Sequence, residues 1–139
     1  MKQVLMYVIL FSSVQIWAQS FEAGLWKSKE SLELNGIPLP SSSDEECITK
    51  EQAKDAKATI EKELKKKGCT LTKWNYKNQN LDAAITCNNK DMVASGKLTG
   101  PFTSKSYKLT CEATGTYKDV LPAVAELKLS GERVSACSK

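Results

Sequence analysis

The sequence predicts a mainly β fold: an antiparallel β meander curled into an open or partly closed barrel, with one α-helix packed on it. Three observations predict this. Apolar and polar residues alternate over six segments, as in strands with one buried face. One segment has a helical apolar stripe instead. Five cysteines occur in 139 residues, and disulfides between them would support a small core that is poor in large aliphatic residues.

The first twenty residues, "MKQVLMYVILFSSVQIWAQS", have the order of a secretory signal peptide: a basic residue, a short apolar run, then polar and small residues. We expect a signal peptide over residues 1–19, cleaved after Ala18 or just beyond. The alternative is an uncleaved anchor, but a span needs about 20 apolar residues and Ser12 interrupts the run early. Residues 20–139 are therefore expected to form a single β-rich domain that is periplasmic or secreted, with no membrane span.

An exported chain keeps its disulfides, so the cysteines are expected to pair. Cys69 and Cys87 flank two strand-like runs around the polar centre "KNQN", which places them opposite each other in a hairpin. Cys111 lies on the apolar face of "SYKLTCEATGTY" and is predicted to be a buried free thiol. Cys47 and Cys137 remain, and their pairing would join the start of the helix to the last strand.

The elements follow in order. A first strand covers about residues 25–35, with Trp26 and Leu32 on one face. The stretch "NGIPLPSSSDEE" is predicted to turn away from the sheet, because its prolines restrict the backbone and its serine and acidic run cannot pack. A helix over about 49–67 begins at Thr49, with Gln52 completing a capping box, and ends at Gly68. Five further strands are predicted, at residues 70–76, 81–87, 92–99, 106–117 and 123–135.

The last strand contains Arg133, the sole arginine beside nineteen lysines. Alternation from Leu127 through Gly131 places Arg133 on the inner face, where its planar guanidinium could lie on the ring of Trp26. A bulge at Gly131 would instead turn Arg133 to solvent, as glycine in a strand often signals. The pattern alone leaves both interpretations open.

The G-x-W start, Gly24 to Trp26, together with an arginine late in the last strand resembles the closure of lipocalin-like barrels. A resemblance to the bacterial envelope proteins of domain-of-unknown-function family 3617 extends over nearly all of residues 20–139. It depends on "GLW", "CITKEQA", Cys69 before "TLTKW", "ITC" at Cys87 and the ending "SGERVSAC". The resemblance implies a small β-rich envelope domain and no particular activity or ligand.

Residue types and motifs that the chain lacks narrow the range of possible functions. Without histidine there is no Ser-His or Cys-His pair and the commonest zinc ligand is missing; no C-x-x-C spacing supports a cysteine zinc site, and no glycine-rich phosphate loop occurs. We therefore expect no catalytic residue, no metal and no cofactor. Nucleic acid is not an expected partner, because the lysines do not interleave with aromatic residues.

We expect a monomeric, non-enzymatic binding or interaction module that holds a small apolar ligand or docks an envelope component, with Trp26, Glu30 and Arg133 as binding residues. Glu30 shares a face with Trp26 and is expected to neutralise Arg133. Two other hypotheses remain: a small exported hydrolase that uses carboxylates such as Glu30, and an inhibitor of a host enzyme.

Overall fold

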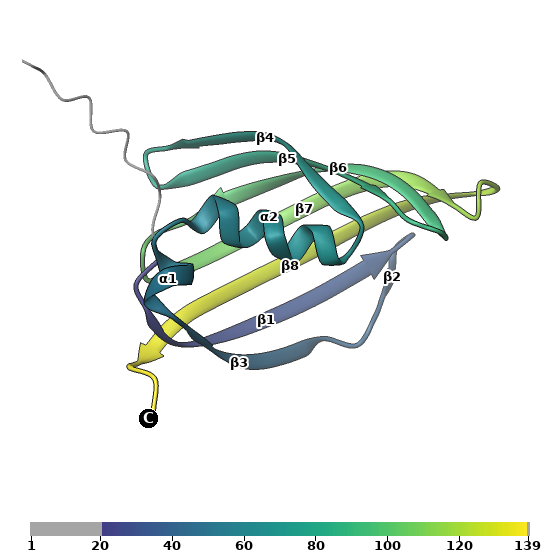
Figure 1. The fold of residues 1–139 in the computed structure, drawn as a ribbon. Helices are drawn as coiled ribbons and strands as arrows, with labels where there is room; N and C mark the ends of the chain where they lie inside the picture. The colour runs from purple at the N-terminus through teal and green to yellow at the C-terminus, as the bar shows by residue number, and fades with distance from the viewer. Residues whose placement is uncertain (1–20, 139) are drawn as a thin grey trace, which may run out of the picture.

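The computed structural model describes residues 21–138, so the predicted signal peptide lies outside the described residues. Eight strands form one curved antiparallel sheet that is not closed, as the sequence predicts, in the order β2-β1-β8-β7-β6-β5-β4 with β3 also paired to β1. Figure 1 shows the sheet wrapping around a helix that lies across its concave face. No helix within residues 21–138 is both long and apolar enough to cross a membrane.

The meander is the part that the sequence predicts most directly. Each strand pairs with the next along the chain, and β1 (Gly24–Leu34) returns to pair with β8. The inner face of every long strand carries the alternating apolar residues. The meander strands are β4 (Cys69–Lys77), β5 (Asn80–Asn88), β6 (Met92–Pro101), β7 (Ser106–Tyr117) and β8 (Leu121–Ser135).

The stretch after β1 contradicts its prediction. Instead of leaving the sheet, it forms the two-residue β2 (Ile37–Pro38) and the strand β3 (Ser42–Ile48), whose residues pair from Ser42 with Glu30 to Ile48 with Gly24. β3 lies at an edge, where nearly all its side chains are exposed. Backbone pairing with β1 and the disulfide at Cys47, rather than apolar packing, hold this strand, so its polar composition is no obstacle and it has no hydrophobic period to detect.

The predicted helix is present but divided. Thr49 caps α1 (Lys50–Ala53) with the predicted capping box to Gln52, and the chain then starts again at Asp55, whose side chain caps α2 (Ala56–Lys66) by accepting from the Ala58 N–H at 3.0 Å. An aspartate in mid-helix competes for the backbone N–H groups ahead of it, which explains the break. α2 ends at Gly68, as predicted, where φ is +75°.

The core fills the space between α2 and the inner face of the meander. Leu81, Ala83, Leu98 and Phe102 are among its buried residues. Two disulfides reinforce it, and both are the predicted pairs: Cys69–Cys87 joins opposite positions of the β4–β5 hairpin, and Cys47–Cys137 joins β3 to the segment after β8. Cys111 is buried and free, as predicted.

Candidate functional site

One end of the concave face is closed by aromatic rings. Trp26 is 5% exposed, and its indole lies parallel to the ring of Tyr107, with centroids 6.2 Å apart. Tyr107 also stacks on Phe102 at 6.1 Å, while Phe21 contacts Trp26 and Phe102 with centroids at 5.4 and 5.1 Å. Four rings from the N-terminal segment, β1 and the β6–β7 region thus seal this end.

Gly131 provides the space for Tyr107. A Cβ atom at position 131 would lie 2.5 Å from two atoms of the Tyr107 ring, closer than any side chain tolerates. Pairing of β8 with β1 and β7 runs through Gly131 without a shift, and the irregularity falls between Leu25 and Trp26 instead. No bulge therefore turns Arg133 away, and its side chain, 25% exposed, lies on the inner face.

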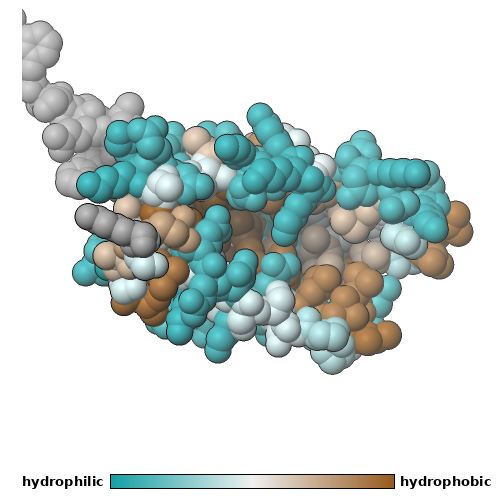
Figure 2. Space-filling view, turned by 60° about the horizontal axis from the view of Figure 1, so that its bottom comes forward, coloured by the Kyte–Doolittle hydropathy of each residue, from teal (hydrophilic) through white to brown (hydrophobic). Residues whose placement is uncertain are grey.

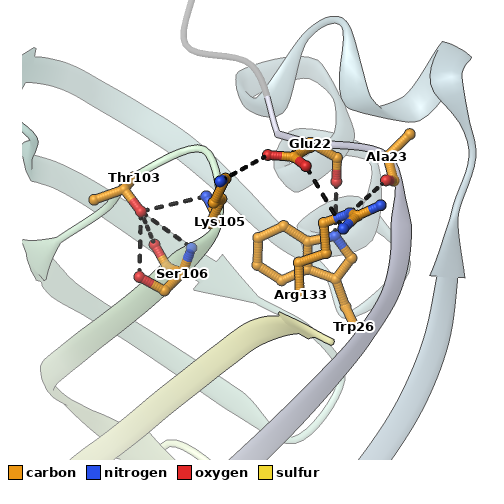
Figure 3. A network of polar contacts seen from close by, with 7 residues as sticks. All are labelled: Glu22, Ala23, Trp26, Thr103, Lys105, Ser106 and Arg133. Atoms are coloured by element: carbon orange, nitrogen blue, oxygen red, sulfur yellow. Dashed lines mark hydrogen bonds and ion pairs between the residues drawn. The ribbon is translucent and has the colours of Figure 1, made fainter. Parts of the chain in front are cut away.

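Arg133 packs against the first residues of the described chain. Its Nε–H donates to the carbonyl of Ala23 at 2.7 Å, and its Nη1 lies 3.5 Å from Glu22 Oε1. Gly24 lies directly beneath the guanidinium: a Cβ there would be 2.6 Å from Nε, and Gly24 has a φ of +147°. The indole N–H of Trp26 donates to the Glu22 carbonyl at 2.9 Å (Figure 3). Gly24 and Trp26, the two fixed residues of the G-x-W motif, therefore both contribute to this corner.

Arg133 points inward, as in one of the two interpretations that the sequence left open, but its contacts there are a hydrogen bond and an ion pair, and no cation–π contact with Trp26 is found among residues 21–138. The expectation that Glu30 neutralises Arg133 is wrong. The acidic partner of Arg133 is Glu22, not Glu30, because Glu30 pairs with Leu129, four residues away along β8. At about 3.3 Å per residue this separation is ~13 Å along the strand, and among the described residues the ion pair of Arg133 is with Glu22. Sharing a face does not bring two side chains together when the register separates them.

The turn between β6 and β7 holds the same corner from the other side. The Oγ1 of Thr103 accepts from the backbone N–H groups of Lys105 and Ser106 at 3.3 and 3.1 Å. The carbonyls of Ser104 and Lys105 are thereby presented to the N–H groups of Glu22 and Arg133, at 2.7 and 2.9 Å. Figure 3 shows Lys105 reaching toward Glu22, with its Nζ 3.9 Å from Oε2.

Glu30 and Glu46 lie on the inner face of β1 and β3, since Glu30 is opposite Leu129 and Glu46 is opposite Trp26. Burial raises the pKa of the Tyr107 hydroxyl, and the negative charges of Glu46 and Glu30 raise the pKa further. Glu30 is therefore close enough to the aromatic end to influence it, although it holds no partner there. Of the three predicted binding residues, Trp26 and Arg133 lie together and Glu30 lies farther along the groove.

A cavity of about 260 Å³ lies between α2 and the inner face of the sheet, beside the aromatic end. Figure 2 shows a hollow in the middle of this face with an apolar floor and a hydrophilic rim. Its polar lining is confined to a few side chains, among them Glu46, Glu63 and Lys67. The apolar lining comprises Phe21, Trp26, Ile48, Ile60, Leu64, Leu98, Phe102, Tyr107, Leu109 and Leu129.

A larger depression of about 790 Å³ spans β1, β3, β7 and β8 and is lined by residues such as Lys27, Lys29, Lys108 and Glu132. These side chains are charged and exposed, so they are well hydrated. The smaller cavity is the better candidate site, because apolar walls next to a few polar groups are what a small-molecule site offers.

Several residues of this cavity were not identified from the sequence. Phe21, which lines the cavity, and Glu22, which pairs with Arg133 beside it, precede the predicted first strand, and no contact was predicted for either. Tyr107 was seen only as a member of an alternating strand, and Ile60 and Leu64 only as part of the helix stripe. The unusual feature near Tyr107 is Gly131, a glycine that interrupts an apolar face, and that signal could have indicated a ring packed against it.

The family model described as "Protein of unknown function (DUF3617)" matches residues 21–137. Searches of curated proteins and of solved structures found no match.

Proposed function

The chain belongs to the DUF3617 family, a family described only as proteins of unknown function, and we propose from its geometry that it is a non-enzymatic module that binds a small apolar ligand between α2 and the sheet. The proposal rests on one observation, the apolar cavity beside Trp26 and Tyr107. A sheet that is not closed leaves this space reachable from solvent beside the helix.

The size of the cavity restricts the ligand. An engineered apolar cavity of about 150 Å³ holds benzene, and sites for drug-sized molecules begin at about 300 Å³. A volume of about 260 Å³ therefore suits one ring system or part of a single acyl chain. The rings at the closed end offer flat apolar surface, and Glu46, Glu63 and Lys67 stand where a polar end of the ligand would emerge.

The residues that line the cavity support binding without catalysis. The chain contains no histidine, and the wall of the cavity is mostly hydrocarbon and aromatic. Export to the periplasm or the medium is supported by the sequence of residues 1–19 and is compatible with two disulfides, which persist in oxidising compartments.

The test is ligand uptake by the delipidated chain. A neutral naphthylamine dye, whose fluorescence rises in apolar surroundings, should bind saturably with one site per molecule. Ile60→Trp places a larger side chain in the cavity and should weaken dye binding at least tenfold, whereas Val134→Trp, at an exposed position on β8, should leave it unchanged. Unfolding by urea is recorded for each variant, so that loss of fold and loss of binding are distinguished.

Native mass spectrometry of chain purified from its own envelope, without reduction, gives an independent readout. A lipid-sized adduct on the native chain that is lost in Ile60→Trp supports the proposal. Absence of any adduct together with absence of saturable dye uptake contradicts it.

A further inference from the structure

Three turns meet at the end of the sheet opposite the aromatic end. The N–H of Asn35, in the β1–β2 turn, donates to the Val124 carbonyl, and the N–H of Val124 donates to Asn35 Oδ1, both at 2.8 Å. The N–H of Lys118, in the β7–β8 turn, donates to the Asp91 carbonyl of the β5–β6 turn at 2.7 Å. These bonds join the β1–β2 turn to the first residues of β8 and the β7–β8 turn to the β5–β6 turn, so the three turns lie at one end of the sheet.

This end of the molecule exposes aliphatic side chains. Ile37 is 64% exposed, Val120 is 79% exposed, and Leu121 and Val124 are each 60% exposed. Figure 2 shows apolar groups at the tip of the long hairpins. We name these residues, with Leu34 and Tyr117, the apolar rim. A cluster of exposed aliphatic residues on neighbouring turns indicates a surface that meets an apolar partner.

A basic cluster adjoins the apolar rim. The last two turns of α2, residues 62–67, carry four lysines and one glutamate. The helix ends at Gly68, whose carbonyl accepts from the Asn88 N–H at 2.9 Å, so these lysines lie next to the β5–β6 turn. That turn contributes Lys90 next to Asp91, and the β7–β8 turn contributes Lys118 next to Asp119, with Lys118 Nζ 5.4 Å from the centre of the Tyr117 ring. The excess of positive charge in the basic cluster therefore comes from the end of α2.

We infer that the apolar rim and the adjoining basic cluster dock the protein onto an anionic lipid bilayer, with the β7–β8 turn inserted among the lipids. Charge complementarity selects this occupant: lysines flank the aliphatic tips, which is how peripheral proteins combine shallow insertion with attraction to acidic headgroups. The tips lie on separate turns and are aliphatic, which suits a fluid apolar layer. Lys67 and Leu64, at the end of α2 that carries the basic cluster, also line the cavity. The inference goes beyond the proposed function and does not require a bound ligand.

The first experiment is sedimentation of the mature, disulfide-bonded chain with vesicles. The chain should bind vesicles of phosphatidylcholine and phosphatidylglycerol at a ratio of 7:3 and bind much more weakly to phosphatidylcholine alone. Replacing both Val120 and Leu121 with serine should weaken binding at least tenfold, because those side chains then no longer bury hydrocarbon. Val134→Ser, an exposed position at the other end of β8, is the matched control and should bind normally.

The lysines are tested separately. Lys90→Gln with Lys118→Gln should weaken binding to the anionic vesicles by roughly fivefold per lysine and should have little effect in high salt. Lys29→Gln with Lys97→Gln, on exposed positions of β1 and β6, is the control of equal charge change and should retain binding. Insertion is measured with Val120→Trp, whose fluorescence brominated lipid should quench, in contrast to Val134→Trp.

Equal binding by the rim variant and the native chain, or equal losses in the rim and control variants, would overturn the inference. So would a native chain that ignores anionic vesicles, including one that self-associates through the rim. Dye uptake measured without vesicles is unaffected by any of these results, so failure of membrane docking and failure of the proposed ligand site are distinguished.

Discussion

Gly131→Ala tests whether the aromatic end depends on the missing side chain at position 131. The added Cβ would lie 2.5 Å from two atoms of the Tyr107 ring, and the ring cannot simply retreat, because it stacks on Trp26 and Phe102 with centroids 6.2 and 6.1 Å away. Overpacking of this kind costs about 1 to 3 kcal/mol. Alanine also leaves the unfolded chain less conformational freedom than glycine does, which stabilises the folded protein by about 0.4 to 1 kcal/mol. We expect a net destabilisation of about 1 to 2 kcal/mol.

Urea unfolding followed by tryptophan fluorescence measures this change, since Trp26 is buried against Tyr107. The matched background is Tyr107→Leu, in which the ring that collides with position 131 is absent. Adding Gly131→Ala to that background should cost less than about 0.5 kcal/mol, because the two residues are in contact and their effects are not additive. A single Gly131→Ala variant as stable as the native chain, or an equal cost in both backgrounds, would refute the reasoning.

Three further predictions concern the disulfide and the titratable groups. Replacing Cys47 and Cys137 with serine opens a loop with a sequence separation of 90 and should reduce the free energy of unfolding by about 4 to 5 kcal/mol in the chain-entropy model, measured by urea unfolding; a loss below 1 kcal/mol would contradict it. Because the pKa of Tyr107 is raised by burial and by nearby carboxylates, the folded chain favours the protonated phenol, so stability present below the unfolded pKa of about 10 should fall as pH rises above it. Tyr107→Phe should show a shallower fall as the pH rises above about 10, and parallel curves would count against this cause. Burial also raises the pKa of Cys111, so iodoacetamide at pH 8.5 should label it at least a hundredfold more slowly in the native chain than in urea, and equal rates would show that the thiol is accessible.

Much of the fold could be predicted because its strands and its helix leave periodic patterns of apolar residues in the sequence. Strands with one buried face alternate, and the meander from β4 to β8 was predicted from that alone. Hairpin geometry placed Cys69 opposite Cys87, and alternation assigned Cys111 to the interior. The helix cap at Thr49 and the helix end at Gly68 also depend on a few neighbouring residues, so both could be predicted from the sequence.

The elements that escaped prediction lack such a local signal. β3 has solvent on both faces, so its polar sequence shows no period, and only its pairing with β1 makes it a strand. The break at Asp55 was hidden because the apolar stripe continues across it, while the capping bond to Ala58 ends one helix and starts another.

The candidate site, like the fold, could be predicted from the sequence only in part. By itself, the sequence placed Trp26 on the inner face, since face follows from counting residues along a strand, but it left Arg133 open between the inner face and solvent, and only the unshifted pairing through Gly131 decided for the inner face. Only the tertiary structure decided that Glu22, rather than Glu30, neutralises Arg133, because the partner of a charge depends on register and on where the chain enters the sheet. The cavity under α2 was likewise decided by the structure, because its volume depends on how far a helix stands from a sheet, a distance that no period in the sequence encodes.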